Sequence, residues 1–493
     1  MSRPMATLLL LSLAAGCAAG PSYHPETVVP ASTRVGTAGS SAPARQFFDS
    51  LAAARDSDTV TVSTRVPPKV ILPDSLASLE WLDIFRDSTM LRLVRTSLVQ
   101  NRDLQTAVAR IREFRAEVGI ARAPLFPSLS ATGSVSTNQV AIGSFPPTQY
   151  DAFRLTADVA WELDFWGRTR RGIEAARADL ASEEATQRTV VLSLVSDVAT
   201  GYLSLLELDQ ERSLAERTLA SRQATLNLAR RRFQQGLTSE LDVRQFEAQV
   251  AVPAATLAQT ERLRAQQEHQ LSLLIGQAPT RIPGRGGLPD AVSALSIPDS
   301  LPASLLTRRP DVQAAERAFA AATARIGVAQ AARLPAISIT GYYGTQTATA
   351  DDLFSTNSEI YQALAGISLP IFTGGRLING TRAARARADQ ARLQYEQTVL
   401  IALREASDAL AGVRTSGDQV SAQLTQTQAL RRALHLAELR YRTGIASYVE
   451  VLEAQRSLFD AELALSRAQL DQLAAAVGLY RALGGSWPAG EGD

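Results

Sequence analysis

Apolar and polar side chains alternate strictly over four short stretches of the chain, two in each half. In one of them, every second residue from Phe153 to Phe165 is apolar and most residues between are polar. A period of two is typical of a strand with one apolar and one polar face. Loops rich in Gly, Pro, Asn and Asp separate the stretches. The pattern therefore predicts two β-hairpins, at about 128–165 and about 336–372.

Helical patterns surround each hairpin. Three helices are predicted in each half, at about 102–124, 168–235 and 239–275 in the first and at about 309–332, 376–443 and 447–483 in the second. At 1.5 Å per residue, each of the longest segments would form a helix about 100 Å long. Gly201, Gly412 and Gly417 lie inside these segments, so a break into two shorter helices is the alternative.

The two halves are copies of one helix–hairpin–helix unit. Pro127 and Gly236 have counterparts at Pro335 and Gly444, and each pair is separated by the same 208 positions. Chance similarity between helical regions would not keep one register over so many positions. The predicted organisation is a first repeat at 76–284, a linker at 285–308, a second repeat at 309–484 and a tail at 485–493.

The N-terminus has the pattern of a targeting signal. Arg3 precedes an apolar run from Leu8 to Leu13, and small residues follow it up to Cys17. We predict a lipoprotein signal peptide at 1–16 and a lipid-anchored extended segment at 17–75, with a plain signal peptide as the alternative. Beyond residue 20 there is no run of 18 apolar residues, so we expect no membrane-spanning helix.

Composition excludes several classes of function. The net charge of +1 gives no electrostatic argument for binding nucleic acid. A single cysteine and three widely separated histidines fit no thiolate cluster and no metal-ligand spacing. No phosphate-binding loop, zinc motif or nucleophile elbow is present. We therefore expect no cofactor, no metal site and no enzyme.

The hairpins pose a physical problem, because a hairpin has open edges and an uncovered apolar face. In a soluble protein that face packs on helices. Strands of about 10 to 13 residues, however, match the thickness of an outer membrane. The smallest membrane barrels have about eight strands, so four strands cannot close one alone. The sequence thus predicts an oligomeric channel, and three copies would supply twelve strands, although this argument does not fix the number three.

Several motifs, in order and partly repeated, make the chain resemble the TolC-like outer-membrane efflux factors, in the lipoprotein branch that serves resistance–nodulation–division pumps. The motifs are Cys17 with Gly20 to Pro25, Trp81 to Phe85, Ala160 to Arg168, Arg308 to Val312, Leu369 to Phe372 with Gly374 to Arg376, Arg440 to Gly444, Val451 to Leu458 and Tyr480 to Trp487. The resemblance covers nearly the whole chain after the signal.

The resemblance implies a mostly α fold with membrane β-hairpins. Three chains would form a twelve-stranded outer-membrane β-barrel, continued by a long periplasmic α-helical barrel. A belt around this barrel would consist of residues at about 76–98 and 280–305 and of the C-terminus. It implies a passive conduit that exports drugs or other small molecules. Its implied partners are outer-membrane lipids, a periplasmic adaptor and an inner-membrane resistance–nodulation–division transporter, whose docking opens the channel.

The resemblance also implies roles for residues at the periplasmic tip. The adaptor would dock at the turns of Gly236 and Gly444. Glu450, Glu453 and Val449 match the pore constriction, and Asp242 and Tyr441 match contacts that hold the tip closed. A basic residue that assists this closure elsewhere is replaced here by Ala446.

Two observations bear on these expectations independently of the family. Glu450 and Glu453 are three residues apart, so they share one helix face and would form a negative ring around an axis. The alternative is that they are ordinary solvated carboxylates. The alternative for the whole chain is a periplasmic coiled-coil adaptor or structural protein, but such proteins would show a lipoyl-like or small barrel domain instead of long alternating hairpins.

Overall fold

The computed structural model describes residues 19–23, 34–36, 85, 87–141, 147–284, 287–289, 300–443, 445 and 447–485. The chain forms two compact units, and several long helices contribute to both. Unit 1 comprises residues 1–28, 108–186 and 313–398, and unit 2 comprises residues 29–107, 187–312 and 399–493.

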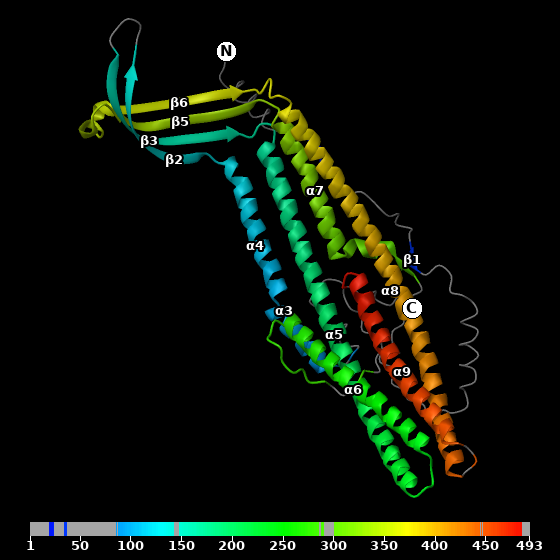
Figure 1. The fold of residues 1–493 in the computed structure, drawn as a ribbon. Coiled ribbons are helices and arrows are strands. Elements are labelled where there is room, and N and C mark those ends of the chain that lie inside the picture. Colours follow the sequence, from blue (N-terminus) through cyan, green and yellow to red (C-terminus); the bar gives the residue numbers. More distant parts are fainter. Residues whose placement is uncertain are drawn as a thin grey trace. The chain divides into compact units, whose positions relative to one another are not determined.

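Unit 1 contains one four-stranded antiparallel sheet, whose strands lie side by side in Figure 1. In sheet order the strands are β2 (Ser128–Val140), β3 (Thr148–Leu163), β5 (Ala336–Thr347) and β6 (Glu359–Ser368). Both predicted hairpins are thus present, and β3 of the first pairs with β5 of the second. Among the described residues, the outer strands β2 and β6 each have one neighbouring strand.

The register of this sheet places most apolar residues of all four strands on one face. Ala131 pairs with Ala157, which pairs with Tyr343, which in turn pairs with Tyr361. Because side chains alternate between faces, the neighbours at every second position lie on this same side. The face is open to solvent in a single chain, where Tyr361 is 82% exposed.

Both hairpins end before the predicted positions, β3 two residues and β6 four residues earlier. After β3, the carboxylate of Asp164 accepts hydrogen bonds from the first backbone N–H groups of the next helix, at 3.0 and 2.9 Å. After β6, Pro370 has no N–H to donate to a strand ladder. Apolar residues continue the alternating pattern past both strand ends, so the pattern alone placed these ends too late.

The helices of unit 1 lie next to a short N-terminal segment. This unit includes α7 (Pro310–Ala331) and most of α4 (Arg102–Arg122), which a 3₁₀ turn follows. The backbone N–H of Ala19 donates to Trp166 at 3.0 Å. The ring of Tyr23 lies edge-on to Phe319 of α7, with ring centroids 5.4 Å apart. Residues 19–23 are therefore fixed to unit 1 although they lie far from α7 in sequence.

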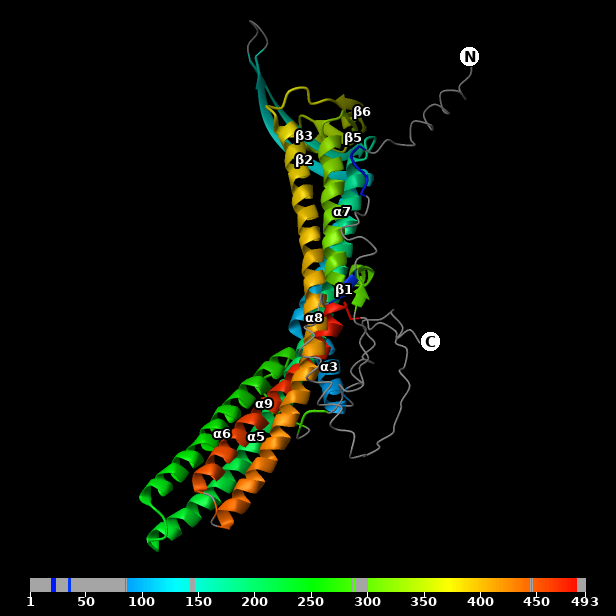
Figure 2. The same ribbon diagram turned by 90° about the vertical axis from the view of Figure 1, so that its right-hand side faces the viewer.

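Unit 2 is built mainly from helices (Figure 2). They are α3 (Ser88–Gln100), the later part of α5 (Arg168–Gln234), α6 (Glu240–Leu274), the later part of α8 (Arg376–Arg442) and α9 (Tyr448–Ala482). Residues of the predicted extended segment form β1 (Arg34–Gly36), which pairs with β4 (Ser300–Pro302). This pairing was not predicted from the sequence.

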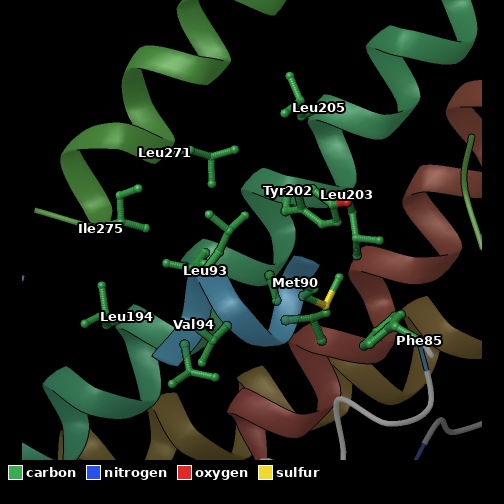
Figure 3. Close-up of a cluster of buried hydrophobic side chains, with 14 of the residues drawn as sticks. Phe85, Met90, Leu93, Val94, Leu194, Tyr202, Leu203, Leu205, Leu271 and Ile275 are labelled. Atoms are coloured by element: carbon green, nitrogen blue, oxygen red, sulfur yellow. The ribbon is translucent and has the colours of Figure 1, made fainter. Parts of the chain in front are cut away.

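The core of unit 2 gathers apolar side chains from α3, α5, α6 and α9 (Figure 3). Met90 and Val94 of α3, Tyr202 of α5 and Leu271 of α6 are all fully buried. One 18-residue window of α5 is apolar enough, by length and composition, to cross a membrane, and 56% of it is buried in the structure. This window is not an uninterrupted apolar run, so the prediction of no membrane-spanning helix did not take it into account. The core that α5 shares with α3 and α6 accounts for much of its apolar character.

Both long segments are single helices in the structure, so the predicted alternative of a break is wrong for α5 and α8. A Cβ atom at Gly201 would lie 3.0 Å from the side chains of both Gln267 and Leu271. The amide of Gln267 also donates to the Gly201 carbonyl oxygen at 2.9 Å. This glycine therefore allows α6 to approach α5 closely.

Candidate functional site

The candidate site comprises the two turns that join α5 to α6 and α8 to α9 in unit 2. At the first turn Gly236 has a φ of +72°, which ends the helix because few residues other than glycine adopt it without strain. The N–H of Gly236 donates to Phe233, and the N–H of Leu237 donates to Arg232, both at 2.9 Å. These bonds satisfy carbonyl groups that the end of α5 would otherwise leave unpaired.

Asp242 caps the start of α6. Its Oδ2 atom accepts hydrogen bonds from the hydroxyls of Thr238 at 2.6 Å and Ser239 at 2.8 Å, and from the Ser239 N–H at 3.1 Å. The Ser239 hydroxyl in turn accepts from the Asp242 N–H, which completes a capping box. These hydrogen bonds, that of Thr238 foremost, lower the pKa of Asp242.

The second turn keeps the backbone pattern of the first but not its cap. The N–H of Ile445 donates to Arg440 at 3.0 Å, which repeats the bond made 208 positions earlier. Gly444, the predicted second docking glycine, lies outside the described residues. The residue at the position of Asp242 is Glu450, and the N-cap of α9 has no side-chain hydrogen bond. The carboxylate of Glu450 lies instead 3.7 Å from the Arg440 guanidinium.

The three residues predicted for the pore constriction lie together on the exposed side of α9. Val449 is 58% exposed, and the side chains of Glu450 and Glu453 are 47% and 59% exposed. Val451 and Leu452, between the carboxylates, are buried. The first turns of α9 therefore pack one side against the bundle and leave an acidic side uncovered.

Each of these carboxylates has an arginine nearby in its own chain. Glu453 contacts Arg456 at 2.7 Å, and Glu450 is near Arg440. Exposed ion pairs of this kind contribute about 0–1 kcal/mol. They therefore do not hold the carboxylates strongly in place, but they reduce the net charge that a ring of them would carry.

Within one chain, Tyr441 contacts Arg232 and Tyr448. Its hydroxyl accepts a hydrogen bond from Arg232 at 2.9 Å, and its ring lies edge-on to Tyr448 with centroids 5.0 Å apart. Tyr448 packs on Phe246 of α6 at 4.2 Å, and burial raises the pKa of its hydroxyl. Within one chain, Tyr441 and Asp242 are thus held by separate partners.

Three residues that contact one another or Tyr441 at these turns were not predicted as site residues: Arg232, Phe246 and Tyr448. Arg232 could have been identified from the repeat, because its counterpart at the 208-residue offset is Arg440. Cys17, the predicted lipidation site, lies outside the described residues. Within the part of the chain that the structure describes, no group of three or more His, Cys, Asp or Glu side chains is arranged to hold a metal ion.

Comparison with known proteins identifies the family of this architecture. The model of the family described as "Outer membrane efflux protein" matches residues 93–277 and 301–485, one segment in each repeat. The toluene efflux pump outer membrane protein TtgC of Pseudomonas putida is 38% identical over 417 residues, covering 83% of this chain and 85% of the relative. The cation efflux system protein CusC of Escherichia coli is 31% identical, covering 84% and 90%.

A solved structure shows the same fold. The outer-membrane channel OprN superimposes with a TM-score of 0.78 at 30% identity, covering 87% of this chain and 99% of that channel. The family model covers well over half of the chain, and each of its two segments contains most of one copy of the repeat. The chain therefore belongs to the outer membrane efflux protein family.

Proposed function

We propose that this chain forms the outer-membrane exit duct for small organic compounds rather than for metal cations. The general function follows from the family: the chain is an outer-membrane efflux channel and not an enzyme. It works as a homotrimer with a periplasmic adaptor and an inner-membrane transporter. Organic cargo is supported by the higher identity to the toluene efflux protein, 38% against 31% for the cation efflux protein.

The open edges of the sheet explain why the channel needs several copies. β2 and β6 stand at the two ends of the four-stranded sheet, and every pairing within it is antiparallel. With four strands of alternating direction, β6 of one chain and β2 of the next would also be antiparallel. Such head-to-tail pairing closes a ring and removes both edges.

The two faces of the sheet fit a channel wall. The apolar face carries Leu129 and Ile367, which are 75% and 74% exposed in one chain and would face lipid in the barrel. The opposite face carries serine, threonine and charged residues. Among them, Arg154 lies over the ring of Tyr342, 4.3 Å from its centroid. A polar face of this kind suits a water-filled lumen.

The periplasmic coiled-coil alternative has no support from these observations. A coiled-coil adaptor is not expected to contain a sheet with 12- to 16-residue strands at its centre and one exposed apolar face. Family membership places the sheet in the outer membrane and the helical part in the periplasm.

We further propose that Val449, Glu450 and Glu453 line the narrowest part of the duct. The absence of a capping hydrogen bond at the second turn supports this role. Asp242 caps the start of α6, whereas Glu450 does not cap α9, so its carboxylate is available to face the duct. Three copies of two exposed carboxylates around one axis would attract cations. A contact of Asp242 with Tyr441 would then be one between neighbouring chains at the same end.

Replacing both Glu450 and Glu453 with alanine is expected to raise single-channel conductance and to lower the preference for potassium over chloride in planar bilayers. Loss of the carboxylates removes negative charge and side-chain bulk from the proposed constriction. The matched control is Glu462→Ala on the same helix, where the carboxylate is held by Arg431 at 2.7 Å. Conductance and selectivity equal to those of the control would remove the two residues from the constriction.

Deleting the gene for this chain is expected to make its host several-fold more sensitive to toluene, with little change toward transition-metal cations. Inhibitory concentrations measured before and after reintroduction of the gene check this. A deletion strain that becomes sensitive to metal cations but not to toluene would contradict the proposed cargo. The channel assignment would survive that outcome, because it rests on the family.

A further inference from the structure

Two carboxylates are buried side by side where α5 packs against α9 in unit 2. Glu207 and Glu211 are one helical turn apart on α5, so their side chains point to the same side. They are 5% and 4% exposed. Glutamate is rarely buried to this extent unless its charge is compensated.

The residues that the structure describes around this pair supply too little positive charge to compensate both carboxylates. Arg467 of α9 donates from Nε to Glu211 at 2.9 Å, and its side chain is 64% exposed. The Oε1 atom of Glu207 is buried without a hydrogen-bond partner, and so is the hydroxyl oxygen of Ser466 on α9. Within the described part of the chain, one largely exposed arginine therefore faces two buried carboxylates.

Neighbouring arginines are engaged elsewhere. On α6, Arg264 contacts Asp209 at 2.5 Å and Glu268 at 2.9 Å. On α5 itself, Arg212 contacts Glu216 at 2.9 Å. Among the described residues, the charged groups that act on Glu207 are thus Glu211 on its own helix and Arg467 on α9, and the neutral Ser466 hydroxyl lies nearby.

Two ionised carboxylates in such a contact would repel each other in a poorly solvated place. Desolvation and a like charge both favour the neutral acid. If one carboxyl keeps its proton, its hydroxyl can donate to the other carboxylate, and the remaining negative charge matches the single arginine. A metal ion is a poorer fit, because the described residues offer no third acidic or histidine ligand here.

We propose that Glu207 and Glu211 form a buried proton-binding site, and that the shared proton holds α5 against α9. Loss of the proton leaves two like charges in the helix contact, so α5 and α9 separate more easily. The helical part of the channel then becomes more deformable at alkaline pH than at acidic pH.

The pH range follows from the pKa of Glu207. Burial first, and the charge and hydrogen bond of Glu211 next, raise this pKa to about 7, while Ser466 and Arg467 oppose the shift. A carboxyl whose folded-state pKa is raised stabilises the fold fully below its unfolded-state pKa. That contribution disappears as the pH rises through about 7.

Infrared difference spectroscopy of the full-length trimer in detergent tests the site directly. A protonated carboxyl C=O band is expected below pH 7 and is expected to vanish as the pH rises above it. Glu207→Gln should lack this band, because the amide keeps the size and polarity but cannot release a proton. Glu216→Gln, on the same helix with an exposed carboxylate, should keep it.

Hydrogen exchange gives a second readout of the same trimers. After correction for intrinsic exchange rates, the α5 segment around Glu207 should exchange several-fold faster in the native protein above pH 7 than below it. Glu207→Gln should remove this difference. The proposal is overturned if the native protein shows no titrating carboxyl band, or if Glu207→Gln is as pH-dependent as the native chain. The native spectrum decides this even if the variant does not fold.

Discussion

Replacing Ala157 with arginine is expected to abolish assembly of the channel in the outer membrane. Ala157 lies in the middle of β3 on the apolar face, between Ala131 and Tyr343. An arginine that faces lipid near the midplane of a barrel costs about 2–4 kcal/mol, and every chain of the oligomer would carry one. Membrane fractionation and semi-native gel electrophoresis would show loss of the heat-modifiable trimer.

The matched control is Ala160→Arg, which places the same side chain on the opposite face of the same strand. Ala160 pairs with Ser128 and Thr340, so the arginine would extend into the polar lumen and stay hydrated. This variant should assemble at close to the native level and change only conduction. Equal tolerance of both variants would contradict the assignment of the two faces.

The faces of the sheet could be predicted from sequence because alternation and register are governed by one constraint. A slip of one residue between strands would move every apolar side chain to the wrong face, so a strictly alternating pattern tolerates only the observed kind of pairing. The strand ends could not be predicted in this way. They depend on single local interactions, such as the hydrogen bonds of Asp164, which override a pattern that continues further.

At the turns of unit 2 as well, some features could be predicted from sequence and others depend on local contacts. Gly236 was enough to place the first turn, because its left-handed backbone ends the helix. The 208-residue offset then placed the second turn, which lies between α8 and α9. The role of Asp242 was harder to foresee. The carboxylate of Asp242 accepts hydrogen bonds at the start of its own helix. The family resemblance had instead implied a contact with Tyr441. The packing of Tyr441, Tyr448 and Phe246 depends on how helices rotate against each other, which no local pattern specifies.

The buried carboxylate pair shows most clearly what could not be predicted from sequence. Two glutamates four residues apart on a long helix are normally part of a solvated face, and nothing within α5 distinguishes Glu207 and Glu211 from its exposed acids. The two glutamates become a buried site only because α9 packs against them with Arg467 and Ser466. Its chemistry is a property of the packing between distant segments and not of either segment alone.

Tyr202→Ala should lower the unfolding free energy of unit 2 by about 3–5 kcal/mol, the range found when large buried side chains are removed. Tyr202 is fully buried in the core that joins α3, α5 and α6, and its hydroxyl donates to the Asp87 carboxylate at 3.3 Å. That carboxylate also caps α3. Tyr202→Phe, which keeps the ring and loses only the hydroxyl, should cost about 1 kcal/mol. Denaturant titration followed by hydrogen exchange in α3 separates the two effects. If both variants were destabilised equally, the hydroxyl and not the ring would hold α3 to the core, because only its hydrogen bond is lost in both.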